Sequence, residues 1–182
     1  MILPIYLYGN PILRKISVDI TPDYPELDKL ISDMFETMYK ADGIGLAAPQ
    51  IGLNINLFVI DATALAKDNP ELADFKRVFI NPKVVFNTSN TIAVEEGCLS
   101  VPSIHENVNR PSDLTIEYLN EKFEPITEQL VDYKAIVIQH EYDHLKGIFF
   151  VDKISPIKRK LIQKKLISIA KGRVSTSYRV KV

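Results

Sequence analysis

The stretch His140-Glu141-Tyr142-Asp143-His144 decides how the rest of the chain is interpreted. It follows the pattern H-E-x-x-H. On an α-helix, residues i and i+4 lie on one face, so His140 and His144 can present two imidazole nitrogens to one metal ion. Glu141 can then act as general base toward a water on that ion. A surface helix that carries two histidines by chance would match the same pattern, so the motif by itself leaves metal binding open.

The residues before this motif suit a helix. Asp132 is a good N-cap, residues 135–138 are apolar without proline or glycine, and Gly147 is a plausible stop. Part of the apolar run is β-branched, so propensity alone does not decide between a helix and a buried strand. The histidine spacing favours the helix.

Length and composition indicate an ordinary globular protein. A chain of 182 residues with 46% hydrophobic and 25% charged residues can build one core, and we expect residues 1–182 to form a single domain. The formal net charge is −1, which argues against a nucleic acid or an anionic membrane as partner. The basic cluster at residues 158–165 is expected to be a solvated helix face.

Cysteine usage and the N-terminus indicate a cytoplasmic protein. Cys98 is the only cysteine, which rules out an intrachain disulfide and fits a reducing compartment. Residues 1–8 are apolar but lack a basic start and contain Pro4, so they make a poor signal peptide. No apolar run approaches the roughly 18 residues that span a bilayer.

Hydrophobic periodicity predicts an α+β fold. A helix is expected over residues 27–39, where apolar side chains recur at helical spacing. A last helix is expected to start at Ser155-Pro156 and end at Gly172, with Ile157, Leu161, Leu166 and Ile169 facing the core. Strands are predicted for residues 55–60, 78–86, 91–94, 114–119 and 125–131, the last two as a hairpin. We therefore expect strands packed around a central metal-binding helix, with an N-terminal and a C-terminal helix.

A catalytic metal bound by H-E-x-x-H needs a third protein ligand. An extended motif with a third histidine at position 150 is excluded, because Phe150 stands there. His105 falls in an expected loop at residues 102–105, where a histidine is usually solvated. Cys98 is the better candidate, because a thiolate binds divalent metals well. A lone cysteine is otherwise most often a small buried hydrophobe.

The segment from Gly43 to Gln50 reads Gly-Ile-Gly-Leu-Ala-Ala-Pro-Gln. Gly43 and Gly45 allow a ligand to approach the backbone closely. The Gln50 amide can donate to a developing oxyanion. The alternative is a loop that ends a helix and packs on the core. The pattern differs from G-x-G-x-x-G, so a dinucleotide site is not expected.

Three segments in this order, Gly43 to Gln50, Glu96-Gly97-Cys98-Leu99-Ser100 and the H-E-x-x-H stretch, resemble the signature motifs of bacterial peptide deformylases. The resemblance spans nearly the whole chain. It implies hydrolysis of the formamide at the N-formyl-methionyl end of nascent polypeptides, which the enzyme would meet near the ribosome exit tunnel. The products would be formate and a free amine.

The resemblance also implies a metal and a set of roles. The metal would be held by Cys98, His140 and His144, commonly as Fe²⁺ in the cell, with Zn²⁺, Ni²⁺ or Co²⁺ able to substitute. These ligand types alone do not select among the four metals. Glu141 would move the proton, and the oxyanion would be held by the Gln50 side chain and the Leu99 backbone N–H. Gly45 would pair with the substrate backbone, and Arg110 would pair with Asp143.

A pocket for the methionine side chain follows from helical spacing. Ile136 and Val137 lie one turn before His140, and Tyr133 lies two turns before it, so all three share its face. Ile44 and Val94 close the pocket if their segments meet there. The alternative is that Ile136 and Val137 are ordinary core residues.

Two rival functions remain at this point. One is a zinc peptidase that cleaves ordinary peptide bonds, and the other is a non-catalytic deformylase-like protein that only binds a metal. Glu141 and Gln50 argue against the second, because binding alone requires neither side chain.

Overall fold

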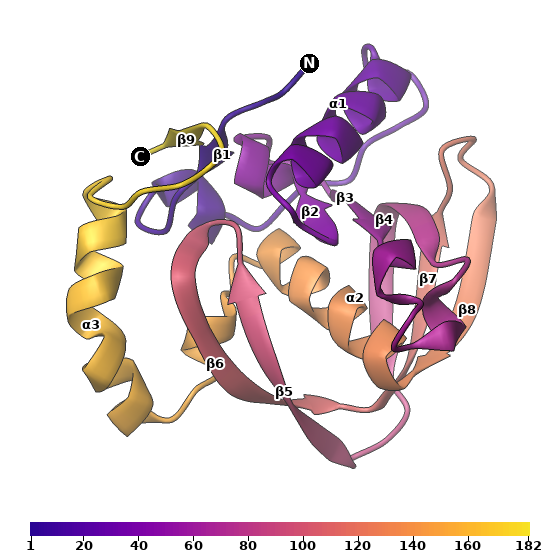
Figure 1. The fold of residues 1–182 in the computed structure, drawn as a ribbon. Helices are drawn as coiled ribbons and strands as arrows, with labels where there is room; N and C mark the ends of the chain where they lie inside the picture. The colour runs from indigo at the N-terminus through magenta and orange to yellow at the C-terminus, as the bar shows by residue number, and fades with distance from the viewer.

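The computed structural model describes residues 1–182 and arranges its strands around one central helix (Figure 1). This helix, α2 (Asp132–Leu145), packs against the five-stranded sheet and also contacts a separate two-stranded hairpin. The other two helices are α1 (Leu27–Lys40) and α3 (Pro156–Ala170), which flank this centre. The expected α+β arrangement is confirmed.

The strands form three sheets. The strands are β1 (Ile5–Tyr6), β2 (Gly45–Ala47), β3 (Leu57–Asp61), β4 (Lys76–Phe86), β5 (Thr91–Cys98), β6 (Val101–Pro111), β7 (Asp113–Leu119), β8 (Pro125–Val131) and β9 (Val180–Lys181). An antiparallel sheet has the order β2-β3-β4-β7-β8, so β2 is an edge strand. β5 and β6 form an antiparallel hairpin, and β1 pairs with β9 in parallel. The predicted hairpin of β7 and β8 is confirmed.

The helix α2 is buried on several sides. Ala135, Val137, Ile138 and Leu145 pack into an apolar cluster with the five-stranded sheet. A helix that buries most of its surface belongs in a core rather than at the surface. The polar residues in the second half of α2 are therefore mostly buried. The helix begins without a side-chain cap, so the N-cap expected of Asp132 is wrong.

Two other expectations from the sequence are wrong. Residues 102–105 lie in the strand β6 rather than in a loop. On α3, Ile157 and Leu161 are 76% and 78% exposed, whereas Ile162, Leu166 and Ile169 are buried. None of the helices combines the length and the apolar character needed to cross a bilayer.

Candidate metal centre and active site

Cys98, His140 and His144 converge beside the central helix. Cys98 ends β5, and the two histidines lie one turn apart on α2. Their ligand atoms all lie within 4.8 Å of one another, and Cys98 Sγ is 3.2 Å from His144 Nε2. One thiolate with two imidazoles is a donor set for a divalent zinc, iron, cobalt or nickel ion, and three protein ligands leave a position open for substrate or water. The residues present therefore fit a catalytic metal.

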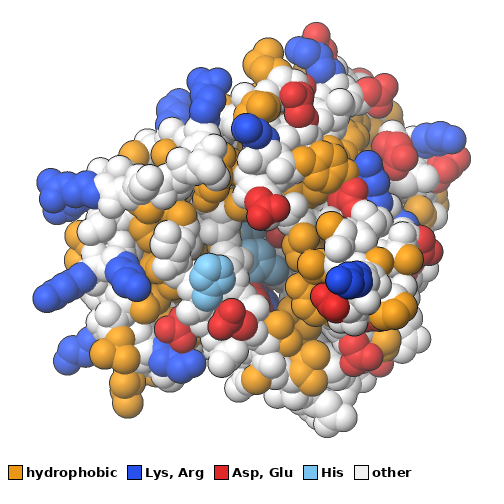
Figure 2. All heavy atoms as spheres, viewed as in Figure 1, with side chains coloured by type: hydrophobic (Ala, Val, Ile, Leu, Met, Phe, Trp, Pro, Cys, Tyr) orange, Lys and Arg blue, Asp and Glu red, His pale blue; other side chains and the backbone are white.

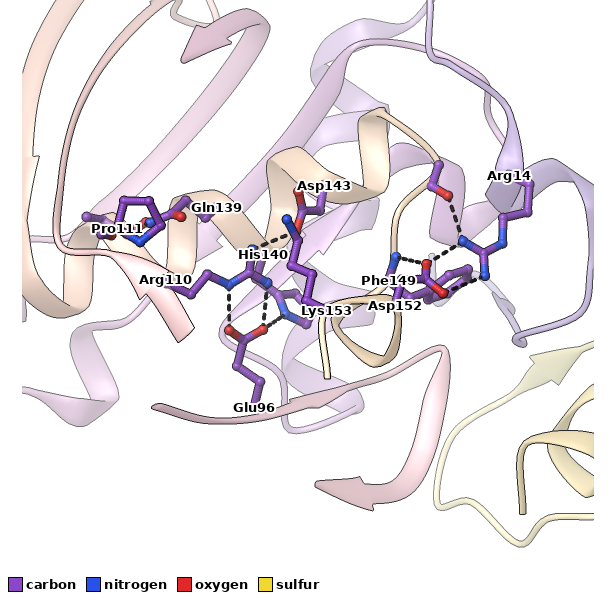
Figure 3. Close-up of polar contacts among 12 residues, drawn as sticks. Arg14, Glu96, Arg110, Pro111, Gln139, His140, Asp143, Phe149, Asp152 and Lys153 are labelled. Carbon is purple, nitrogen blue, oxygen red and sulfur yellow. Dashed lines mark hydrogen bonds and ion pairs between the residues drawn. The ribbon is translucent and has the colours of Figure 1, made fainter. Parts of the chain in front are cut away.

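A buried ion-pair network orients the first histidine (Figure 3). Nδ1 of His140 lies 2.8 Å from a carboxylate oxygen of Glu96, which turns Nε2 away from this carboxylate. Arg110 donates two hydrogen bonds to Glu96, at 2.6 and 2.8 Å, and one to Asp143 at 2.6 Å. Burial alone would raise the pKa of Glu96, but Arg110 and His140 lower it to about 2. The network ties β5 and β6 to α2, and with them the cysteine to the two histidines.

The expected pair of Arg110 with Asp143 is confirmed. Arg110 is 1% exposed and Asp143 is also reached by Lys153 at 3.3 Å, so the pair is part of a larger cluster than expected. Glu96 was not predicted from the sequence, although it begins the cysteine motif. Its partner His140 lies far along the chain, and only the packing of β5 on α2 brings the two together.

Arg110→Met is expected to lower the free energy of unfolding by about 3–5 kcal/mol, because two buried carboxylates lose their shared cation. Denaturant titration of the purified variant measures this loss. Lys29→Met is the matched control, since Lys29 pairs with Glu26 at the surface and exposed pairs contribute about 0–1 kcal/mol. Equal losses in the two variants would contradict a structural role for the Arg110 network.

Glu141 carries an oxygen that no protein group satisfies. The residue is 5% exposed, and its Oε2 has no hydrogen-bond partner. Burial raises the pKa of this carboxyl to about 7. Gly45, on the edge strand β2, packs directly against the Glu141 side chain. A Cβ at position 45 would lie 2.7 Å from Glu141 Cδ. Glycine is therefore required there to leave room for the carboxylate.

Two further donors sit beside Cys98. Oε1 of Gln50 accepts a hydrogen bond from the Ala47 N–H at 2.8 Å, which fixes the amide so that Nε2 points at Cys98 Sγ, 3.6 Å away, and at Ser100 Oγ, 3.2 Å away. Leu99 lies in the two-residue turn between β5 and β6, and its N–H donates to no protein atom. Ser100 is fully buried and was not predicted.

These groups open into a cavity of about 500 Å³. Figure 2 shows the hollow, with histidine side chains inside it and at its rim. The five residues predicted for the methionine pocket all line it, namely Ile44, Val94, Tyr133, Ile136 and Val137. His105 also lines the cavity but faces Gly97 and is not part of the metal-ligand cluster. Residues 175–178 also line the cavity, which the sequence did not indicate.

The site has a Cys-His-His cluster, a buried carboxylate beside it and a cavity into which both open. This arrangement is that of a metal-dependent hydrolase. Comparison with known proteins identifies the family. The family model for polypeptide deformylase matches residues 2–160, and the chain belongs to this family. These enzymes are metallohydrolases that remove the N-formyl group from nascent polypeptides.

Relatives and solved structures agree with this assignment. Peptide deformylases from Flavobacterium johnsoniae and Christiangramia forsetii are 50% and 47% identical, and each alignment covers 100% of this chain and 96% of the relative. The crystal structure of the Thermus thermophilus peptide deformylase superposes with a TM-score of 0.83 at 34% identity, covering 95% of this chain and 100% of that one. The Plasmodium falciparum enzyme gives a TM-score of 0.83 at 33% identity, covering 92% and 95%.

Proposed function

We propose that this chain hydrolyses the formamide of N-formyl-methionyl nascent peptides with one divalent metal ion held by Cys98, His140 and His144. The ion is Fe²⁺ in the cell, with Zn²⁺, Ni²⁺ or Co²⁺ as substitutes. When bound, it supplies a Lewis acid that polarises the formyl carbonyl and lowers the pKa of water. The observation that carries the proposal is the unpartnered, buried Glu141 oxygen on the same helix as the histidines.

Glu141 moves the proton. Its Oε2 takes a proton from the attacking water, and the same carboxyl then protonates the nitrogen that leaves as the free amine. The packing of Gly45 against this side chain supports the role, because the contact limits where the carboxylate can lie. The formyl carbon keeps the water oxygen and departs as formate.

Gln50 and Leu99 stabilise the oxyanion that develops on the formyl oxygen. The Gln50 carbonyl is occupied by Ala47, so its Nε2 is held ready to donate toward the space beside Cys98. The Leu99 N–H has no protein acceptor. Donors fixed before the reaction stabilise developing charge without having to reorganise, which makes this type of contribution large.

The substrate backbone adds to the edge of the five-stranded sheet. β2 has β3 on one side only, and Gly45 lies both in this strand and on the wall of the cavity. An extended peptide can therefore pair with β2 as an additional strand. In this proposal the N-terminal side chain of the peptide enters the apolar part of the cavity.

The methionine side chain occupies the part of the cavity lined by Ile44, Val94, Tyr133, Ile136 and Val137. Ile136 and Val137 are 3% and 5% exposed, so their free faces are small and directed at the cavity. An unbranched thioether adapts readily to such a surface. Ordinary core residues would be buried to the same extent. The role is therefore tested by placing a larger side chain at one of these positions.

Val137→Phe is expected to raise KM for formyl-methionyl peptides more than for formyl-alanyl peptides, because the larger ring fills the space of the thioether. Each methylene contact is worth ~0.8 kcal/mol, so the preference for methionine should shrink about tenfold or more. Steady-state kinetics on the two peptides measure the ratio. Val85→Phe, at a strand position 60% exposed, is the control. Equal losses on both substrates would place Val137 in the core alone.

Residues 1–182 act as one catalytic domain in this proposal. The substrate is a nascent chain, so the enzyme works in the cytoplasm near the ribosome exit tunnel, without a nucleic-acid or membrane site of its own.

A side-by-side assay separates the alternatives. Purified enzyme is given a formyl-methionyl peptide and the same peptide without the formyl group, and formate and new peptide ends are measured. The proposal requires formate from the first and no cleavage of the second. Cleavage of internal peptide bonds would indicate a zinc peptidase, and no reaction with metal bound would indicate a binding protein.

A further inference from the structure

A tail, defined here as residues 174–182, runs along the active site after α3. It lies outside residues 2–160, the part matched by the family model. Its side chains alternate between half-buried and exposed, as in an extended strand. β9 within the tail pairs with β1, where the Ile5 and Leu7 N–H groups donate to Arg179 O and Lys181 O at 2.9 and 2.8 Å. The tail is therefore anchored to the body of the protein.

Tyr178 is the tail residue that reaches the site. Its hydroxyl donates to the Leu99 carbonyl at 2.8 Å. Thr176 in turn donates to the Tyr178 carbonyl at 2.8 Å, which shapes the tail just before β9. Burial raises the pKa of Tyr178 to about 12, so the phenol is protonated at neutral pH. The ring is half-buried and lines the cavity.

The turn formed by Leu99 and Ser100 is held from three directions. The Leu99 side chain packs against the glycine-rich segment so closely that a Cβ at Gly43 would lie 2.8 Å from Leu99 Cδ1. The next carbonyl, that of Ser100, accepts from the Tyr8 N–H at 2.8 Å. The Leu99 carbonyl accepts from Tyr178. Each contact comes from a different part of the chain, and only the third comes from the tail.

We propose that Tyr178 is a positioning residue for deformylation, whose hydroxyl holds the Leu99 carbonyl so that the Leu99 N–H stays aimed at the developing oxyanion. The Leu99 carbonyl and the Leu99 N–H flank the same Cα, in the turn of two residues between β5 and β6. The inference rests on the proposed role of Leu99 in the deformylation reaction.

Tyr178→Phe tests the proposal, because it removes one oxygen and keeps the ring that lines the cavity. Complete removal of an oxyanion donor lowers kcat by about 10²–10³-fold. A misaligned donor still contributes part of this stabilisation, so we expect kcat to fall about tenfold. KM should change less than about twofold, and metal content and Tm should stay at wild-type values. Tyr39→Phe is the matched control, since the Tyr39 hydroxyl donates to Asp61 away from the cavity.

The loss should be the same for a formyl-methionyl dipeptide and for a longer formyl peptide, because every substrate develops the same oxyanion. An unchanged kcat would overturn the proposal. So would a loss confined to the longer peptide, which would make Tyr178 a substrate contact, or a loss that follows metal content or Tm, which would make it part of the fold. If wild-type enzyme releases no formate, the proposed function fails instead.

Discussion

Cys98→Ala is expected to abolish stoichiometric metal binding. The thiolate is the only anionic member of the Cys98, His140 and His144 cluster, and two neutral imidazoles hold a divalent ion weakly. Deformylation should disappear with the metal. Elemental analysis of protein purified without oxygen gives the metal content directly, and formate release gives the activity.

His105→Ala is the control for this experiment. His105 lines the same cavity, but it faces Gly97 and lies outside the ligand cluster, so its removal should leave the metal content unchanged. A Cys98→Ala protein with full metal content would remove Cys98 from the ligand set. Loss of metal in the His105 variant would point to a different third ligand.

Glu141→Gln should retain the metal and lose about 10²–10⁴-fold in kcat, the usual contribution of a general base. The amide has nearly the same size, so the close packing against Gly45 is preserved, but it cannot take a proton from water. Rate measurements with saturating formyl peptide, together with metal analysis, separate chemistry from binding.

The matched control is Glu128→Gln, because Glu128 contacts Tyr118 and lies away from the cavity. Its kcat should equal that of the wild type. A loss below about tenfold for Glu141→Gln would mean that another group moves the proton.

Local patterns in the sequence were sufficient for part of the fold and site. Helical spacing placed His140 and His144 on one face, and alternation placed β7 and β8 in a hairpin. The predicted pocket residues on α2 share one face because the same periodicity governs them. Each of these predictions needs only neighbours along one helix or one hairpin.

The remaining features depend on packing between distant segments. The strand β6 was not predicted, because a proline stands near its start and its inward-facing residues include the charged Arg110. The burial of Arg110 is compensated by its hydrogen bonds to Glu96 and Asp143, which lie elsewhere in the sequence. On α3, apolar residues occupy more than one face, so periodicity could not select the buried one. Nothing near Tyr178 in the sequence indicates that its hydroxyl meets Leu99.

The pairing of β1 with β9 bears on how the protein matures. Ile5 leaves the ribosome before its partner Val180, and the residues between the two make up most of the fold. Contacts between residues so distant in sequence form late in folding. The entropic cost of closing such a long loop is offset only after the intervening chain has packed. The body around α2 can therefore assemble before the tail docks. Under the proposed role of Tyr178, the deformylase reaches full turnover only at this last step of its own folding.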